Sequence, residues 1–250
     1  MHNLLLILSV FFASIVESVE ALTIVLAVGT TRGWRSTWYG VAAAAVVLSV
    51  IVLVLGTAVT LIPLGALRLV VGGILLIFGL QWLRKAILRA SGFKILHDEA
   101  AIFAKSKADA RKAKKDDSKG IIDDWYSFTI AFKGVLLEGL EVAFIVITFG
   151  SNQGSIPLAS FSALVAVLTI VIIGSRVHRP LSKVPENTLK FVVGIMLTSF
   201  GIFWGSGGAG VHWPGGDAML FAVIAWIATT SLLQVVWLRR RKIALEMKTA

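Results

Sequence analysis

Long apolar segments without charged side chains constrain this chain more than any other feature of its sequence. Residues 41–57 contain no Asp, Glu, Lys or Arg, and neither do residues 218–238. A helix that crosses the hydrocarbon core of a bilayer needs about 20 apolar residues. A transmembrane β-barrel would require apolar and polar residues to alternate, whereas these segments are apolar on every face. The sequence therefore predicts an all-α, polytopic membrane protein.

Composition supports this class, because 57% of the residues are apolar and only 15% are charged. Typical soluble domains have about 45–50% apolar and about 25% charged residues. Seven transmembrane helices are expected, at approximately 4–28, 37–61, 67–83, 127–149, 158–175, 188–204 and 218–238.

Basic residues are concentrated in alternate connections between these spans. Eleven of the 24 Lys and Arg residues lie in 84–119, and residues 239–242 form the run Arg-Arg-Arg-Lys. The connections 58–66, 151–157 and 205–217 contain no Lys or Arg. Because basic residues are retained on the cytoplasmic side, we expect a multi-pass plasma-membrane protein with its N-terminus outside and its C-terminus in the cytoplasm. The net charge of +10 therefore reflects topology, and nucleic acid is not expected as a partner.

Two pairs of segments indicate an internal repeat. Residues 17–29 match residues 138–150 at five of 13 positions, and residues 63–82 match residues 185–204 at nine of 20. The offsets of 121 and 122 residues make spans 1–3 equivalent to spans 4–6. Because a repeat of three spans is odd, the second copy enters the membrane from the opposite side. Inverted repeats of this kind are typical of secondary transporters.

This repeat sets the expected domain organisation. We expect a first three-helix repeat at 1–83, a basic cytoplasmic linker at 84–126, a second, inverted three-helix repeat at 127–204, and an outer Gly-rich loop, seventh helix and basic cytoplasmic tail at 205–250. For the linker, a solvated segment that sets topology is favoured over a regulatory or lipid-sensing surface helix.

Four glycines recur in the repeat at helical spacing. Gly72 and Gly79 lie seven residues apart, and Gly194 and Gly201 match them in the second copy. Small residues on one helix face allow two helix backbones to approach closely. The glycines therefore predict close helix packing, within the chain or across an isologous homo-oligomer.

Four carboxylates lie in the interior of the predicted spans. Glu17 and Glu20 belong to the first span, and Glu138 and Glu141 to the fourth. Spacing of three residues places each pair on one helix face, and the inverted repeat would bring both pairs to the same depth. An ionised side chain at a helix centre costs about 2.5–3.5 kcal/mol, so four would cost roughly 10–14 kcal/mol without a compensating partner.

Three kinds of partner would offset that cost: a bound cation, protons, or basic side chains. The basic candidates are Lys133, Arg68 and Lys190, which are too few for four clustered acids. Carboxylate clusters suit hard cations such as Mg²⁺, Ca²⁺, Mn²⁺ and ferric iron. We therefore predict a transported or bound metal cation, such as iron or manganese, at the four glutamates. Ser18, Thr23 and Thr148 are nearby oxygens, and His97-Asp98-Glu99 and His212 are weaker metal candidates.

Three function classes fit a polytopic helical protein with buried acids. The favoured one is a secondary transporter of metal cations, in which proton exchange on the same carboxylates would supply the coupling. A membrane-embedded enzyme that uses a carboxylate pair is an alternative, but HExxH and GxSxG are absent from the sequence. A scaffold or accessory subunit is the third class. We expect a transporter, not an enzyme.

The glutamate motifs resemble those of a known family. Seven spans, an outer N-terminus, and Glu-x-x-Glu in the first and fourth spans are similar to the high-affinity iron permease (iron/lead transporter) family. The Gly139-Leu140 filling of the second motif also matches. The resemblance implies that Glu17, Glu20, Glu138 and Glu141 handle the metal. Members carry Arg before each motif, whereas this chain has Val16 and Leu137 there, so it resembles a divergent prokaryotic relative.

Overall fold

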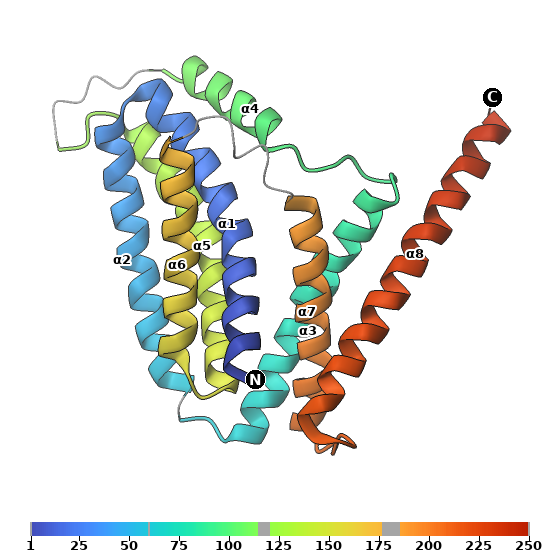
Figure 1. Cartoon of the computed structure of the whole chain (residues 1–250). Helices are drawn as coiled ribbons and strands as arrows, with labels where there is room; N and C mark the ends of the chain where they lie inside the picture. The colour runs from blue at the N-terminus through green and yellow to red at the C-terminus, as the bar shows by residue number, and fades with distance from the viewer. Residues whose placement is uncertain (1, 60, 115–120, 177–185, 250) are drawn as a thin grey trace. The chain divides into compact units, whose positions relative to one another are not determined.

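The fold is described from a computed structural model, which covers residues 2–59, 61–114, 121–176 and 186–249. These residues form no strand. They form eight α-helices and a short 3₁₀-helix: α1 (His2–Arg32), α2 (Trp34–Val59), α3 (Leu64–Ala90), α4 (Glu99–Lys112), α5 (Trp125–Asn152), α6 (Ile156–Arg176), α7 (Glu186–Gly208), η2 (Gly216–Ala218) and α8 (Met219–Thr249) (Figure 1). The all-α class predicted from the sequence is confirmed.

Six of the described helices, α1, α2, α3, α6, α7 and α8, are long and apolar enough to cross a membrane. The shortest apolar stretch among them has 19 residues. At 1.5 Å per residue it extends about 29 Å, which matches a hydrocarbon core of about 30 Å. Several long apolar helices are what a multi-pass membrane protein requires, because a helix satisfies its own backbone polar groups within the bilayer.

Helix α5 corresponds to the predicted fourth span but is not among these six. It has 28 residues, which is ample for a crossing, and it carries Lys133, Glu138 and Glu141. The predicted count of seven spans therefore depends on this one charged helix. The connection between the fifth and sixth predicted spans lies mostly outside the described residues. Residue 185, the first residue of the repeat segment 185–204, also lies outside them.

The chain divides into two compact units, each assembled from separate parts of the sequence. Unit 1 comprises Met1–Ala58 and Asp98–Val184, and unit 2 comprises Val59–His97 and Pro185–Ala250. Each predicted repeat therefore contributes its first two long helices to unit 1 and its third to unit 2. The domain ranges predicted from the sequence follow chain order instead.

In unit 1, α1 packs against α4, α5 and α6 (Figure 1). A methyl group on Gly134 of α5 would lie 2.9 Å from Cγ2 of Ile24, so α1 and α5 approach closely there. Val19, Leu26 and Ile170 form a buried apolar cluster on α1 and α6. Close apolar packing on several sides fixes the orientation of α1 about its axis.

Helix α4 differs from the solvated linker that the sequence favours for 84–126. Asp98 caps its N-terminus by accepting hydrogen bonds from Ala100 N at 2.9 Å and Ala101 N at 3.1 Å, as an N-cap carboxylate does. Phe103 packs against the apolar cluster of α1 and α6, and Ala110 is completely buried. Part of the basic segment is therefore a docked element of unit 1.

Arg32 at the end of α1 holds this segment in place. Its Nε and Nη2 donate to the two carboxylate oxygens of Asp124 at 2.6 and 2.9 Å. The same guanidinium donates to the backbone oxygens of Ala110 and Ala113 at 2.9 and 2.8 Å. The hydrogen bonds from Arg32, opposed by desolvation and assisted by the Ser127 hydroxyl, hold the pKa of Asp124 below its usual value. No motif in the sequence indicates this role of Arg32.

In unit 2, α3 and α7 pack antiparallel along a line of small residues. A methyl group on Gly72 would lie 2.5 Å from the Cα of Gly205, and one on Gly201 would lie 2.6 Å from the Cα of Leu76. Neither methyl fits at such a distance, so the glycines are what permits this approach. The opposed pairs that contain a glycine are Leu69–Gly208, Gly72–Gly205, Leu76–Gly201, Gly79–Thr198 and Leu83–Gly194. The close packing predicted for Gly72, Gly79, Gly194 and Gly201 is confirmed.

Helix α8 completes unit 2 by packing on α3 and α7. Nε of Arg239 donates to the backbone oxygen of Ala90 at 2.8 Å, and Nζ of Lys242 donates to that of Gly92 at 2.8 Å. Basic side chains thus satisfy carbonyl groups at the C-terminus of α3, where the helix dipole also favours positive charge. The basic run has a structural role in addition to its predicted role in topology.

Candidate functional site

The candidate site is built on α1 and α5, the two helices that carry the Glu-x-x-Glu motifs. The side chain of Glu17 is only 2% exposed, and its neighbours Val16 and Val19 are completely buried. The motif therefore faces the interior of unit 1. This orientation follows from the apolar residues around the motif, which the packing of α1 buries on several sides.

Three of the four predicted glutamates converge. One carboxylate oxygen each from Glu17, Glu138 and Glu141 lies within 4.8 Å of those of the other two. We call these residues the carboxylate cluster. Glu138 and Glu141 are half-buried, and Glu17 is buried. The i, i+3 spacing on α5 directs both of its carboxylates to the same side, and the antiparallel packing of α1 brings Glu17 to meet them.

Electrostatics makes this arrangement costly for three ionised acids alone. Two unit charges 4.8 Å apart repel by about 3.5 kcal/mol at an effective dielectric constant of about 20. With three such pairs, the repulsion reaches roughly 10 kcal/mol, which is comparable to the stability of a whole domain. The cluster therefore favours cations or protons among its oxygens.

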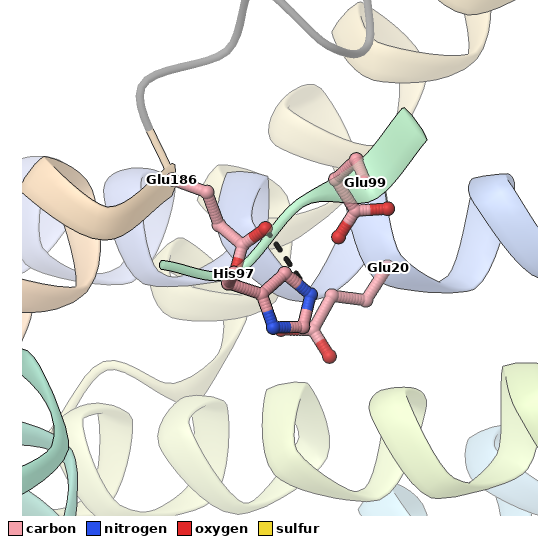
Figure 2. Close-up of side chains that lie close together, drawn as sticks. All are labelled: Glu20, His97, Glu99 and Glu186. Atoms are coloured by element: carbon pink, nitrogen blue, oxygen red, sulfur yellow. Dashed lines mark ion pairs between the residues drawn. The ribbon is translucent and has the colours of Figure 1, made fainter. Parts of the chain in front are cut away.

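Glu20, the fourth predicted residue, has a different neighbour. A carboxylate oxygen of Glu20 lies within 4.8 Å of one of Glu99, the first residue of α4, and both side chains are drawn in Figure 2. Glu99 is buried, with 6% of its surface exposed. The sequence gives no sign of this neighbour, because nothing in a basic and polar segment indicates that α4 docks against α1.

A polar cluster lies in unit 2. Nε2 of His97 is 3.5 Å from Oε2 of Glu186, the ion pair dashed in Figure 2, and Nζ of Lys190 is 3.1 Å from Oε1 of the same carboxylate. Asn187 bridges to the backbone of His97 in both directions, accepting from its N at 3.2 Å and donating to its O at 3.1 Å. Lys190, a basic candidate partner for the span glutamates, thus forms its ion pair with Glu186.

The hydroxyl groups near the motifs are engaged within their own helices. Ser18 donates to the backbone oxygen of Ser14 at 2.5 Å, Thr23 to that of Val19 at 2.8 Å, and Thr148 to that of Phe144 at 2.8 Å. Their oxygens keep lone pairs that can accept hydrogen bonds or bind a cation.

A cavity of about 610 Å³ adjoins the carboxylate cluster within unit 1. Residues of α1, α2, α5 and α6 line it, and Glu17 and Glu138 are among them. We call it the lateral cavity. No motif in the sequence indicates this cavity, because it results from how α2 is spaced from its neighbours.

The remaining metal candidate from the sequence, His212, lies in the Gly-rich loop between α7 and η2 of unit 2 and is exposed. Comparison with protein-family models, with curated proteins and with solved structures found no match to this chain.

Proposed function

We propose that the protein is a secondary transporter of a hard metal cation, such as iron or manganese, in the plasma membrane. The observation that carries this proposal is the convergence of Glu17, Glu138 and Glu141 in the interior of a unit made of apolar helices. Intramembrane carboxylates are rare and commonly mark ion pathways. Oxygen ligands without any thiolate suit hard cations, and the sequence has no cysteine.

In this proposal the three residues of the carboxylate cluster bind the ion directly. Glu20 lies one turn further along α1, beside Glu99, and provides the next carboxylate position on the cytoplasmic side. Exchange of protons for metal on the same groups couples the two fluxes, because the cluster is stabilised by either kind of positive charge. The predicted metal set of Glu17, Glu20, Glu138 and Glu141 thus divides into a central site and an adjoining position.

The contacts between α3 and α7 support an architecture of two inverted three-helix repeats plus one extra helix. Under the repeat offset of 122 residues, Gly72 is equivalent to Gly194 and Leu83 to Gly205. The pair Gly72–Gly205 therefore has Leu83–Gly194 as its twofold counterpart, and Gly79–Thr198 has Leu76–Gly201 in the same way. Reciprocal contacts of this kind are the mark of an isologous, twofold arrangement.

A twofold arrangement also explains the location of the site. The equivalent helices α1 and α5 pack together in unit 1, as α3 and α7 do in unit 2. Carboxylates from two inverted repeats meet near the middle of the membrane, where secondary transporters bind their substrates. This architecture requires α5 to be the seventh span. The negative charge of its two glutamates is then balanced by the bound cation.

The basic residues support an outer N-terminus and a cytoplasmic C-terminus. The C-terminal end of α1 carries Arg32, α4 and its flanks are rich in Lys, and the C-terminal half of α8 carries the Arg239–Lys242 run. With seven crossings, all of these segments lie on the same side of the membrane, and basic residues are retained on the cytoplasmic side. The resemblance of the Glu-x-x-Glu motifs to those of iron permeases favours iron as the first cation to test.

The proposal is tested by reconstituting the full chain in liposomes that contain a metal indicator. Fe²⁺, Mn²⁺, Ca²⁺ and Mg²⁺ are added outside in turn, with a pH dye inside to detect proton exchange. We expect saturable entry of at least one metal, and at least a tenfold loss of rate in Glu17→Gln and Glu138→Gln.

The matched control is Asp109→Asn, which removes one negative charge from an exposed position on α4. Binding to the purified protein is measured in parallel by isothermal titration calorimetry, so that loss of transport is separated from loss of binding. Wild-type transport in Glu138→Gln, or absence of metal entry for every ion in protein that is correctly folded, would contradict the proposal.

A further inference from the structure

The lateral cavity is larger and more apolar than a metal site requires. Of its 23 lining residues, five carry a side-chain oxygen: Glu17, Ser18, Ser49, Glu138 and Ser160. The other lining residues are Gly, Ala, Val, Leu and Trp38. A metal ion needs only a shell of oxygens a few ångströms wide, so a volume of about 610 Å³ with such walls fits an organic molecule of drug size.

The charge of the cavity selects the sign of its occupant. Glu17 and Glu138 are its acidic residues, and among the described residues that line it none is Lys, Arg or His. Two of its serine hydroxyls already donate to backbone oxygens, Ser18 to Ser14 at 2.5 Å and Ser49 to Ala45 at 2.8 Å. The cavity therefore offers acceptors and negative charge, which excludes an anion and favours a cation.

An aromatic side chain strengthens this selection. Trp38 lines the cavity from α2 and stacks on Trp34, with 6.0 Å between the ring centroids. The face of a tryptophan ring attracts cations, most strongly where water is excluded. A cation whose charge is shielded by apolar groups is weakly hydrated, so it loses little on leaving water for a cavity lined by carboxylates and an aromatic ring.

Exposure of the lining residues shows where an occupant enters. Trp38 and Leu53 of α2 are 54% and 67% exposed, and Leu164 of α6 is 53% exposed, although all three line the cavity. Both helices are apolar enough to cross a membrane. The opening between them therefore faces the side of the molecule that lipid covers, and an amphipathic molecule reaches it by diffusing within the bilayer.

We propose that the lateral cavity binds a lipophilic organic cation, held by charge on Glu17 and Glu138 and by contact with the apolar walls and Trp38. The proposal goes beyond metal transport and does not rest on it, because it requires only the cavity and its two carboxylates. Where the metal site is also active, the two kinds of cation compete for Glu17 and Glu138.

The probe is tetraphenylphosphonium, a cation without hydrogen-bond donors, and its matched control is tetraphenylborate, an anion of the same shape. Binding of radiolabelled probe to the full-length protein in detergent is measured by equilibrium dialysis against empty micelles. We expect saturable binding of tetraphenylphosphonium and no saturable binding of radiolabelled tetraphenylborate, which is dialysed separately because the two ions pair with each other. Glu17→Gln and Glu138→Gln are each expected to weaken binding at least tenfold, whereas Asp109→Asn is expected to leave it unchanged.

A second variant separates this proposal from the proposed function. Ala45 is exposed and lines the cavity, so Ala45→Trp reduces the volume while it retains both carboxylates. We expect Ala45→Trp to lose tetraphenylphosphonium binding and to keep the metal binding of the wild-type protein. If the protein binds the organic cation but no metal, the proposed metal site is wrong and the proposed organic-cation site stands.

Three outcomes would overturn the proposal itself. Equal binding of tetraphenylborate would show that the cavity accepts any apolar molecule whatever its charge, including a lipid acyl chain. Unchanged binding in Ala45→Trp would place the probe elsewhere. Absence of saturable binding in correctly folded wild-type protein would show that the cavity does not take a cation of this class.

Discussion

Replacement of Gly72 by Ala tests the glycine seam between α3 and α7. The new methyl would lie 2.5 Å from the Cα of Gly205 and 2.9 Å from the carbonyl carbon of Trp204. Backbone atoms cannot turn aside as a flexible side chain does. Because carbon atoms pack at about 3.5–4.0 Å, the two helices must separate by about 1 Å. Overpacking of this kind typically costs about 1–3 kcal/mol.

The matched control is the adjacent residue. A methyl on Gly73 meets nothing within 4 Å, so Gly73→Ala makes the same chemical change in the same helix without overlap. The higher helix propensity of Ala, worth up to about 1 kcal/mol, applies to both variants and cancels between them. The difference in unfolding free energy between the two variants is therefore expected to be about 1–3 kcal/mol.

The measurement is thermal unfolding in detergent, followed by tryptophan fluorescence at one scan rate. A change of 1 kcal/mol shifts Tm by about 2–4 °C in a chain of this size, so Gly72→Ala should unfold roughly 2–12 °C below Gly73→Ala. Gly205→Ala, whose methyl would lie 3.5 Å from Gly72, should be tolerated. Equal Tm values for Gly72→Ala and Gly73→Ala would refute the close packing.

Three further predictions concern unit 1. Arg32→Gln should destabilise the protein by about 3 kcal/mol, since it leaves the Asp124 carboxylate, 14% exposed, without its guanidinium partner. The control Arg35→Gln breaks an exposed ion pair and should cost less than about 1 kcal/mol. Equal losses of Tm in the two variants would contradict this prediction. The pKa of Asp124 is lower in the folded protein than in the unfolded chain. Its contribution to the free energy of unfolding is therefore complete above the pKa of about 3.9 that it has in the unfolded chain, and is lost as pH falls through its pKa in the folded protein. Unfolding by acid should therefore be less steep in Asp124→Asn, and identical acid profiles would refute the linkage. Gly139→Ala should have little effect on Tm, because its methyl would meet only the end of the Leu48 side chain, and a large loss would show that this side chain cannot move.

The membrane class and the acidic motifs were accessible from the sequence because they depend on local composition. A bilayer imposes length and apolarity on each helix separately, so most spans can be found without knowledge of their neighbours. Helix α5 is the exception, because its charged residues lower its apolarity, and its assignment depends on what those charges contact. The glycine packing was also accessible, since seven-residue spacing places both glycines on one face.

The partners of each carboxylate were not accessible in this way. Spacing along the chain places Glu17 and Glu20 on one face of α1, but it does not tell which neighbouring helix each one meets. The docking of α4 gives Glu20 a neighbour in Glu99, and the antiparallel packing of α5 gives Glu17 two neighbours. Arg32 likewise gained its role from segments about 80–90 residues away.

Local sequence thus accounts for which helices form, which residues they can bury, and where charge interrupts them. The lateral cavity, the three-carboxylate cluster and the docked α4 arise only when helices distant in sequence pack together. Their geometry depends on differences of a few ångströms in helix spacing and rotation. Those differences are decided jointly by many side chains, so no single segment encodes them.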